Sequence, residues 1–145
     1  MIRAYRPRDR TSILEVWAAA SALAHPFLPE AFVAAERRSI ADVHLPAAEV
    51  WVWEIDGRVV GFIAMLGNEI GGLFVDPEHQ GRGIGRALVD HVRASRDRLE
   101  VEVFEDNRIG RAFYAAYGFA EDHEDVHAAT GFAVLRLSLN GPVPS

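Results

Sequence analysis

The residues with the clearest capacity for chemistry form a glycine-rich stretch near the middle of the chain. Residues 80–86, Gln-Gly-Arg-Gly-Ile-Gly-Arg, follow an apolar, β-favouring segment that stops at Asp76-Pro77. Glycines at a strand-to-helix junction allow backbone N–H groups to approach a ligand closely, and the positive end of the helix dipole attracts anions. This arrangement indicates a site for a phosphate or a pyrophosphate.

The glycine spacing does not fit two common nucleotide-binding patterns. A dinucleotide-binding fold needs Gly-x-Gly-x-x-Gly after its first strand, whereas Gly81, Gly83 and Gly85 are one residue too closely spaced and lie mid-chain. A P-loop needs a lysine, and all fifteen basic residues of this chain are arginine. Taken alone, the glycines also fit a tight turn packed closely against a helix.

The composition is that of one folded domain with an acidic balance. The chain has 145 residues, a net charge of −6 and no cysteine, which excludes disulfides, thiolate metal sites and cysteine nucleophiles. A nucleic-acid-binding protein usually has a basic face, and apolar runs such as Val59–Leu66 are too short to cross a bilayer. We therefore expect one domain at residues 1–139, a flexible tail at 140–145, and a cytoplasmic protein that binds neither nucleic acid nor membrane.

Apolar periodicity predicts a mixed α/β protein in which helices cover a largely antiparallel sheet. Val50–Ile55 and Arg58–Leu66 are joined by Asp56-Gly57, a strong hairpin signal. Further strands are expected at residues 2–5, 69–75, 99–104, from 119 onward and at 132–139. Helices are expected at residues 11–23, at 30–42, from the glycine-rich stretch to about residue 98, and between Asn107 and Gly118.

Two stretches of the chain resemble the GNAT superfamily of N-acetyltransferases. Residues 73–86 are similar to its coenzyme A signature, in which Gln80, Gly83 and Gly85 form the Gln/Arg-x-x-Gly-x-Gly/Ala core. Residues 107–119 are similar to a second family element, and the order of strands and helices also matches. The resemblance covers nearly the whole chain. It implies a central mixed, mostly antiparallel sheet of about six to seven strands, about four flanking helices and a splayed strand pair at the cofactor site.

The resemblance implies acetyl-coenzyme A as the co-substrate and no metal. In the family, backbone N–H groups of the glycine loop hold the pyrophosphate, and the preceding strand pairs with the pantetheine amides. An Asn at the start of a later helix adds a contact. Three residues after that Asn, family members often have an alanine, whereas this chain has Gly110. Glycine within a helix lowers its stability by about 1 kcal/mol relative to alanine. Cofactor contacts are thereby carried over to Leu73, Phe74, Val75, Gln80, Gly81, Arg82, Gly83, Ile84, Gly85, Arg86, Asn107 and Phe113.

The resemblance also names candidates for proton transfer. Tyr114 is the candidate general acid, because the family's tyrosine at this position commonly protonates the departing thiolate. A packed aromatic with a surface hydroxyl is the alternative. Glu69, at the start of the strand that borders the acceptor pocket, is the candidate general base, and an exposed strand-end charge is the alternative. Glu102, His79 and His25 are weaker candidates for the base.

The segment between the first two helices is expected to line the acceptor pocket, since family members build that variable pocket there. His25, Phe27 and Leu28 are the candidates, although a packed helix-breaking loop explains them equally well. The implied reaction transfers an acetyl group from acetyl-CoA to a primary amine by direct attack in a ternary complex. The acceptor is a small-molecule amine or a protein amine, and the protein is a monomer or a homodimer.

Two other functions stay open at this point. A non-catalytic acyl-CoA-binding or sensory module on the same fold needs only the strand and the glycine loop. A zinc hydrolase is suggested by His123-Glu-Asp-Val-His127, which matches His-Glu-x-x-His. The residues around this motif favour a strand end and a turn rather than a helix, and no further His, Asp or Glu follows it. We therefore expect a solvated acidic segment near the pocket.

Overall fold

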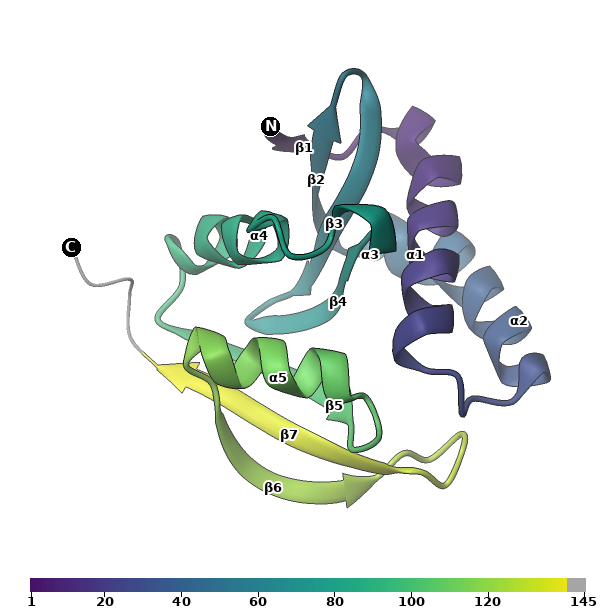
Figure 1. Ribbon diagram of the computed structural model, residues 1–145, viewed down its shortest axis with the longest axis vertical. Helices are drawn as coiled ribbons and strands as arrows, with labels where there is room; N and C mark the ends of the chain where they lie inside the picture. Colours follow the sequence, from purple (N-terminus) through teal and green to yellow (C-terminus); the bar gives the residue numbers. More distant parts are fainter. Residues whose placement is uncertain (141–145) are drawn as a thin grey trace.

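A seven-stranded mixed sheet organises the chain, in the strand order β1-β2-β3-β4-β5-β7-β6 (Figure 1). The computed structural model describes residues 1–140. Neighbouring strands are antiparallel except for β4 and β5, which run parallel. The strands are β1 (Ile2–Ala4), β2 (Glu49–Ile55), β3 (Arg58–Leu66), β4 (Glu69–Val75), β5 (Arg98–Phe104), β6 (Ala120–Val126) and β7 (Ala133–Asn140).

Helices cover both faces of the sheet. Ile13, Val16 and Trp17 of α1 pack with Val52 and Phe62 on one face, whereas α4 and α5 pack on the other (Figure 1). Within the described part of the chain, no helix has the length and apolar character needed to span a membrane. The helices are α1 (Arg10–Ala24), α2 (Glu30–Ser39), α3 (Leu45–Ala47), α4 (Ile84–Arg93) and α5 (Arg108–Tyr117), with short 3-10 or π turns at Pro7–Asp9, Ile40–His44 and Pro77–His79.

The predicted mixed sheet with flanking helices is confirmed, and most elements begin and end within a residue of their expected positions. Helix α4 is shorter than expected. The guanidinium of Arg96 bonds to the carbonyl oxygen of Val92 at 3.0 Å and to that of Gly67 at 3.0 Å, which stabilises an earlier helix end. Of the expected tail at 140–145, Asn140 is the last residue of β7, and the other positions lie outside the described residues.

The parallel pairing between β4 and β5 is very short. It is confined to Glu69–Ile70 on β4 and Glu100–Val101 on β5, and the strands diverge beyond these positions. The divergence coincides with a β-bulge at Gly71, where the pairing of β4 with β3 slips by one residue. A bulge bends and twists its strand. The bulge therefore directs the second half of β4 away from β5.

Backbone groups of β4 face the gap that results. The Asp76 N–H donates to the carbonyl oxygen of Val60 at 2.8 Å, so the adjacent Gly61–Val75 pair is a non-hydrogen-bonded pair of the ladder. Such a pair directs its N–H and C=O groups away from the partner strand. The N–H and C=O groups of Val75 therefore point toward the gap, and those of Leu73 do so by the same alternation. Neither residue pairs with β5.

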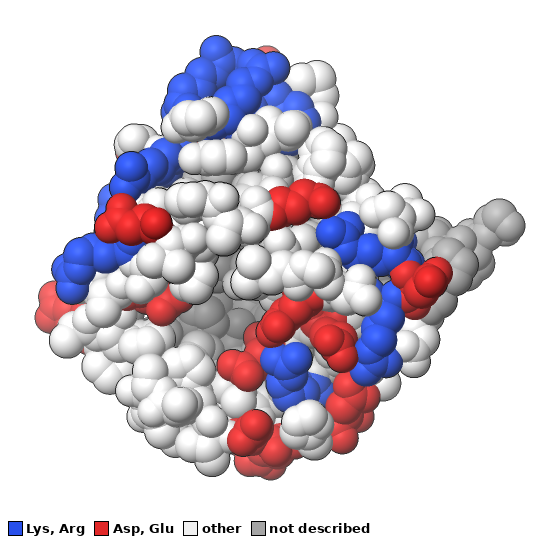
Figure 2. Space-filling view, turned by 180° about the vertical axis from the view of Figure 1, so that it is seen from behind, with Lys and Arg blue, Asp and Glu red and all other residues white. Residues whose placement is uncertain are grey.

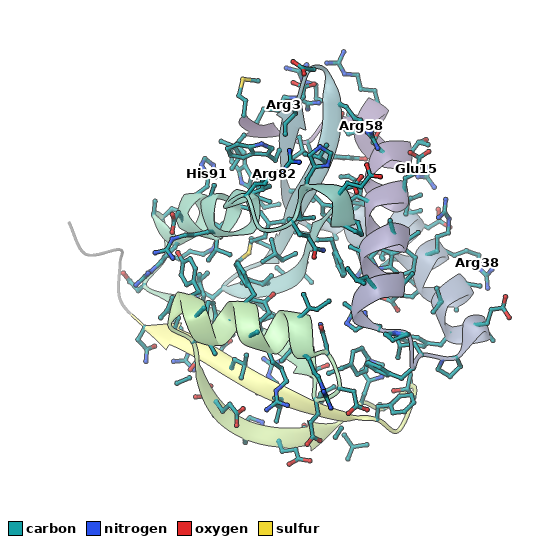
Figure 3. The ribbon with its side chains drawn as sticks, viewed as in Figure 1. Arg3, Glu15, Arg38, Arg58, Arg82 and His91 are labelled. Carbon is teal, nitrogen blue, oxygen red and sulfur yellow. The ribbon has the colours of Figure 1, made fainter. Side chains whose placement is uncertain are left out.

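Helix α1 is fixed to the sheet at its start by a buried ion-pair cluster. Arg3 of β1, labelled in Figure 3, donates to the two carboxylate oxygens of Asp9 at 2.8 and 2.9 Å. Its guanidinium also contacts Glu54 of β2 at 3.3 Å. Asp9 is only 4% exposed and accepts a further bond from the N–H of Arg6 at 2.8 Å. The hydrogen bond from Arg3 lowers the pKa of Asp9.

We expect Asp9→Asn to lower the free energy of unfolding by about 2 kcal/mol at pH 7, since hydrogen bonds to charged groups contribute about 1.5–3 kcal/mol. Folding lowers the pKa of Asp9, so its contribution is complete above the unfolded-state value of about 3.9. The contribution is lost as the pH falls through the folded-state value. Urea unfolding at several pH values measures both effects.

Asp42→Asn is the matched control for this prediction. It removes a solvent-exposed ion pair with Arg10, and we expect a change of less than about 0.5 kcal/mol. If the free energy of unfolding of the wild type exceeded that of Asp9→Asn by the same amount in strong acid as at pH 7, the predicted pH dependence would be wrong.

Candidate active site

A cavity of about 600 Å³ opens where β4 and β5 diverge. Its walls come from α1, α2, β4, β5, α4 and α5, the loop before α4, and a residue that follows β6. Elements from both ends of the sequence thus meet around one gap in the sheet (Figure 1). The volume is in the range typical of small-molecule and cofactor sites.

The glycine-rich loop lines the cavity and leads into α4. Gly81 and Gly83 have φ angles of 79° and 82°, in the left-handed region that favours glycine. The Gln80 side chain donates to the carbonyl oxygen of Val75 at 3.0 Å, which ties the loop back to β4. Helix α4 begins at Ile84, so the N–H groups of its first turn lack partners within the helix and are available to an anion.

All but one of the residues expected to contact the cofactor line this cavity. The exception is Arg82, whose exposed side chain projects from the loop before α4 (Figure 3). Gly85 also serves packing, because a Cβ there would lie 3.2 Å from the Phe113 ring, a tight contact that would require the ring to shift. The lining residues of the expected set are Leu73, Phe74, Val75, Gln80, Gly81, Gly83, Ile84, Gly85, Arg86, Asn107 and Phe113.

Asn107 connects the start of α5 to the end of α1. Its Oδ1 accepts the N–H of Gly110 at 2.9 Å, so its Nδ2 faces Nε2 of His25 at 3.1 Å. Because the amide nitrogen donates, Nε2 of His25 carries no proton. Burial lowers the pKa of His25 to about 4, which keeps the ring neutral at pH 7. The ring proton therefore lies on Nδ1 and is donated to Oγ of Ser21 at 3.1 Å.

The glycine at position 110 has a steric reason in this arrangement. A Cβ on Gly110 would lie 2.5 Å from Nδ2 of Asn107. An alanine there would therefore displace the amide that contacts His25. Glycine at position 110, in place of the family's usual alanine, therefore leaves space for the Asn107 amide to contact His25.

Tyr114 lies at the cavity wall on α5 and is 7% exposed. Its ring packs edge-on against Phe113 and Phe119, with centroids 5.3 and 5.2 Å away. Burial raises the pKa of the phenol above its usual value, so the hydroxyl is a proton donor at neutral pH. Tyr117 differs from it, since its hydroxyl donates to Asp90 of α4 at 2.5 Å and holds the two helices together.

The two candidate carboxylates lie on either side of the point where the strands diverge. Glu69 is not among the residues that line the cavity, and its carboxylate accepts a hydrogen bond from Nη1 of Arg136 at 3.0 Å. Glu102 lies on β5 beyond the paired segment and lines the cavity, with its side chain 38% exposed. Acidic and arginine side chains gather together on this face (Figure 2). The geometry therefore favours Glu102 over Glu69 as the carboxylate beside a bound ligand.

The segment expected to form the acceptor pocket contributes part of it. His25 and Leu28 line the cavity, whereas Phe27 packs against Phe104 and Phe132, at centroid distances of 5.6 and 5.4 Å. Sequence reasoning assigned no site role to several residues that line the cavity, among them two on α2, one on β5 and one in the loop after β6. The spacing of the first two, four residues apart on one helical face, was the only signal for them. These residues are Phe32, Glu36, Phe104 and His127.

The His-Glu-x-x-His match has no helical basis in the structure. Residues 123–126 belong to β6, and four residues of extended chain span about 13 Å. His123 and His127 are therefore too far apart along the strand to share a metal ion as they would on a helix. His127 packs instead against Phe32 and Phe104, at centroid distances of 5.5 and 5.0 Å.

Comparison with known proteins agrees with this geometry. A model of the acetyltransferase (GNAT) domain matches residues 46–121. The chain is 34% identical over 120 residues to peptidyl-lysine N-acetyltransferase YiaC of Escherichia coli K12, a match that covers 82% of each protein. It is 33% identical over 119 residues to peptidyl-lysine N-acetyltransferase YjaB of Salmonella typhimurium, with 81% of each protein covered. Relatives named for catalysis disfavour the non-catalytic binding module.

Solved structures share the fold over nearly its full length. The solution structure of apo-form YjaB from Escherichia coli has a TM-score of 0.86 at 27% identity and covers 97% of both chains. The crystal structure of PaiA N-acetyltransferase from Thermoplasma acidophilum in complex with coenzyme A has a TM-score of 0.79 at 17% identity, over 97% of this chain and 98% of that one. The chain therefore belongs to the GNAT superfamily and is an N-acetyltransferase.

Proposed function

We propose that this enzyme transfers the acetyl group of acetyl-coenzyme A to the side-chain amine of a lysine in a peptide or protein. The observation that carries the proposal is the separation of β4 from β5 beside the glycine-rich loop. It places strand-edge backbone groups, helix N–H groups and Tyr114 around one cavity. The relatives named peptidyl-lysine N-acetyltransferases support the acceptor class.

The cavity offers a complementary group to each part of coenzyme A. The pyrophosphate suits the N–H groups of residues 81–86 and the guanidinium of Arg86. The pantetheine amides suit the edge of β4 at Leu73 and Val75, where they take the place of a neighbouring strand. An N-acetyltransferase of the same fold, PaiA, has been solved with coenzyme A.

We propose that the acceptor enters between α2 and the loop that follows β6. Phe32, Phe104 and His127 provide an apolar passage for the methylene chain of lysine. Glu36 and Glu102 are carboxylates on the same lining, and they attract an ammonium group. The net charge of −6 favours a basic segment as the acceptor.

The proposed chemistry is direct acetyl transfer. Glu102, directly or through water, accepts a proton from the ammonium group, and the free amine attacks the thioester carbonyl carbon. The new C–N bond forms as the C–S bond breaks, and the electron pair of that bond goes to sulfur. The N–H of Val75 polarises the thioester carbonyl, and the Tyr114 hydroxyl donates its proton to the departing sulfur. The nitrogen loses its second proton to the tyrosinate, which restores Tyr114, and Glu102 releases the first proton to solvent. Glu102 replaces Glu69 as the proposed base because it lines the cavity.

The first prediction concerns the acceptor. We expect a lysine peptide with a blocked N-terminus to be acetylated, with one free thiol released per acetyl group. The same peptide with arginine in place of lysine should release none. The enzyme itself contains no lysine, so acetyl-lysine found by mass spectrometry comes from the peptide. Transfer to small amines alone would overturn the peptide acceptor, and coenzyme A binding without any transfer would favour a binding module.

A second prediction concerns the acid. We expect Tyr114→Phe to lower kcat about 100-fold, since positioned proton donors contribute about 10²–10⁴-fold, while the dissociation constant of coenzyme A is unchanged. Steady-state kinetics and calorimetry measure the two quantities. Tyr5→Phe removes a hydroxyl outside the cavity and serves as the control. An unchanged kcat for Tyr114→Phe would leave the tyrosine a packing role only.

A third prediction concerns the base. Glu102→Gln keeps the shape of the side chain but cannot take up the proton, so we expect kcat to fall about 100-fold at pH 7. Glu100→Gln alters a carboxylate on the same strand that pairs with Arg98 instead. It should leave kcat unchanged. Equal rates for wild type and Glu102→Gln across the pH range would rule out this base.

A further inference from the structure

Three polar side chains that line the cavity form one hydrogen-bonded chain between α1 and α5. Oγ of Ser21 lies 3.1 Å from Nδ1 of His25, and Nε2 of His25 lies 3.1 Å from Nδ2 of Asn107. Ser21 and Asn107 are buried, with 4% and 8% of their surface exposed. A network of buried polar groups is rigid when each member has its partner. The chain therefore links the two helices at the wall of the cofactor cavity.

Each hydrogen bond in this chain has one direction. Oδ1 of Asn107 accepts the N–H of Gly110, so the amide nitrogen faces the ring and donates to Nε2 of His25. Nδ1 then carries the ring proton and donates it to Ser21. Burial lowers the pKa of His25 to about 4, which agrees with a neutral ring at pH 7. Both ring nitrogens are thus engaged within the protein, so His25 is not free to take a proton from a substrate.

The amide nitrogen of Asn107 carries two hydrogens, and the chain uses one of them. Within residues 1–140, His25 is the only acceptor bonded to Nδ2. Resonance keeps an amide group planar, so the bonds to Gly110 and His25 together fix the direction of the second hydrogen. Asn107 lines the cavity, and this hydrogen is available to a ligand bound there.

We propose that His25 is a positioning residue for coenzyme A: it accepts one amide hydrogen of Asn107 and so directs the other to an oxygen of the bound cofactor. The inference rests on the proposed binding of coenzyme A in this cavity. It assigns His25, which was expected in the acceptor pocket, to the binding of the acetyl donor. It also gives Gly110 a role in cofactor binding, because a Cβ there would displace the Asn107 amide.

Packing is the alternative role for the same ring. The His25 ring lies edge-on to Phe27 and Phe104, with centroids 5.9 and 5.2 Å away. A ring without nitrogen atoms preserves such contacts, whereas an amide side chain preserves the hydrogen bond to Asn107. Two substitutions at position 25 therefore separate positioning from packing.

His25→Phe keeps the ring but has no acceptor for Asn107. We expect it to raise the dissociation constant of coenzyme A about 10-fold, because the second amide hydrogen loses its fixed direction and a hydrogen bond to the cofactor is lost. His25→Gln lacks the ring, but its side-chain oxygen reaches the position of Nε2 and accepts from Asn107. We expect its dissociation constant to stay within about twofold of the wild-type value. Isothermal titration calorimetry with coenzyme A measures both.

A cycle of single and double substitutions tests the path through Asn107. Asn107→Ser keeps a side-chain oxygen to cap α5 but has no amide hydrogens, so it should weaken coenzyme A binding by itself. In that background His25→Phe should have no further effect, since it acts through the amide. His44→Phe makes the same change at an exposed histidine outside the cavity, and it should leave the dissociation constant unchanged.

Weak binding by His25→Phe, near-normal binding by His25→Gln and no added effect in the Asn107→Ser background support the proposal. The reverse order, an equal loss in both variants at position 25, or additive effects in the cycle overturn it. If His25→Phe does not fold, NMR of the ring nitrogens in the wild type decides: Nε2 without a proton supports the proposal, and a protonated Nε2 overturns it.

The same titrations separate this inference from the proposed function. A wild-type enzyme that binds no coenzyme A would overturn the proposed function and this inference with it. Equal binding of coenzyme A by the wild type and His25→Phe would overturn this inference alone.

Discussion

The interruption of one ladder inside the sheet is the constraint on which the rest of the structure depends. Backbone N–H and C=O groups need partners when they are removed from water, yet β4 has no strand on its β5 side beyond Ile70. The two diverging strands stay in place because β3 holds β4 and β7 holds β5. The free edge of β4 therefore suits an extended ligand with amide groups, which binds as an additional strand would.

The interruption also divides the site between two parts of the chain. Strands β1–β4 with α1 and α4 supply the strand edge and the glycine loop, whereas β5–β7 with α5 supply Glu102 and Tyr114. Polar contacts cross between the parts: His25 with Asn107, and Glu69 with Arg136. Hydrogen bonds depend on direction as well as distance, so these contacts orient the two parts more closely than apolar packing alone.

Burial separates the neutral groups of the cavity from the charged ones. Tyr114 and His25 lie in surroundings that disfavour their charged forms, so both are neutral near pH 7. Glu102 has a partly exposed side chain beside Arg136. Neutral hydrogen-bond donors and charged carboxylates thus occupy different parts of one cavity, a division suited to the two ends of an acetyl transfer from thioester to amine.

The sequence alone predicted the sheet, the helices and an anion site at the glycine-rich loop. These depend on neighbouring residues: apolar periodicity, the Asp56-Gly57 turn, and glycines whose positive φ angles suit a strand-to-helix junction. The individual residues expected to contact the cofactor came from the family resemblance, and all of them except Arg82 line the cavity. The end of α4 was predicted too late, because its stop comes from Arg96 folding back onto Val92 and Gly67 and not from a helix-breaking residue.

Only the tertiary structure decided which acidic residue meets the cavity. Glu69 and Glu102 both lie on strands that border the gap, and alternation along a strand gives no information on where two strands part. The bulge at Gly71 sets that position, so Glu69 falls at the closed end and Glu102 at the open one. The contacts of His25 with Asn107 and of Arg136 with Glu69 join residues far apart in the chain, and only folding brings such residues together.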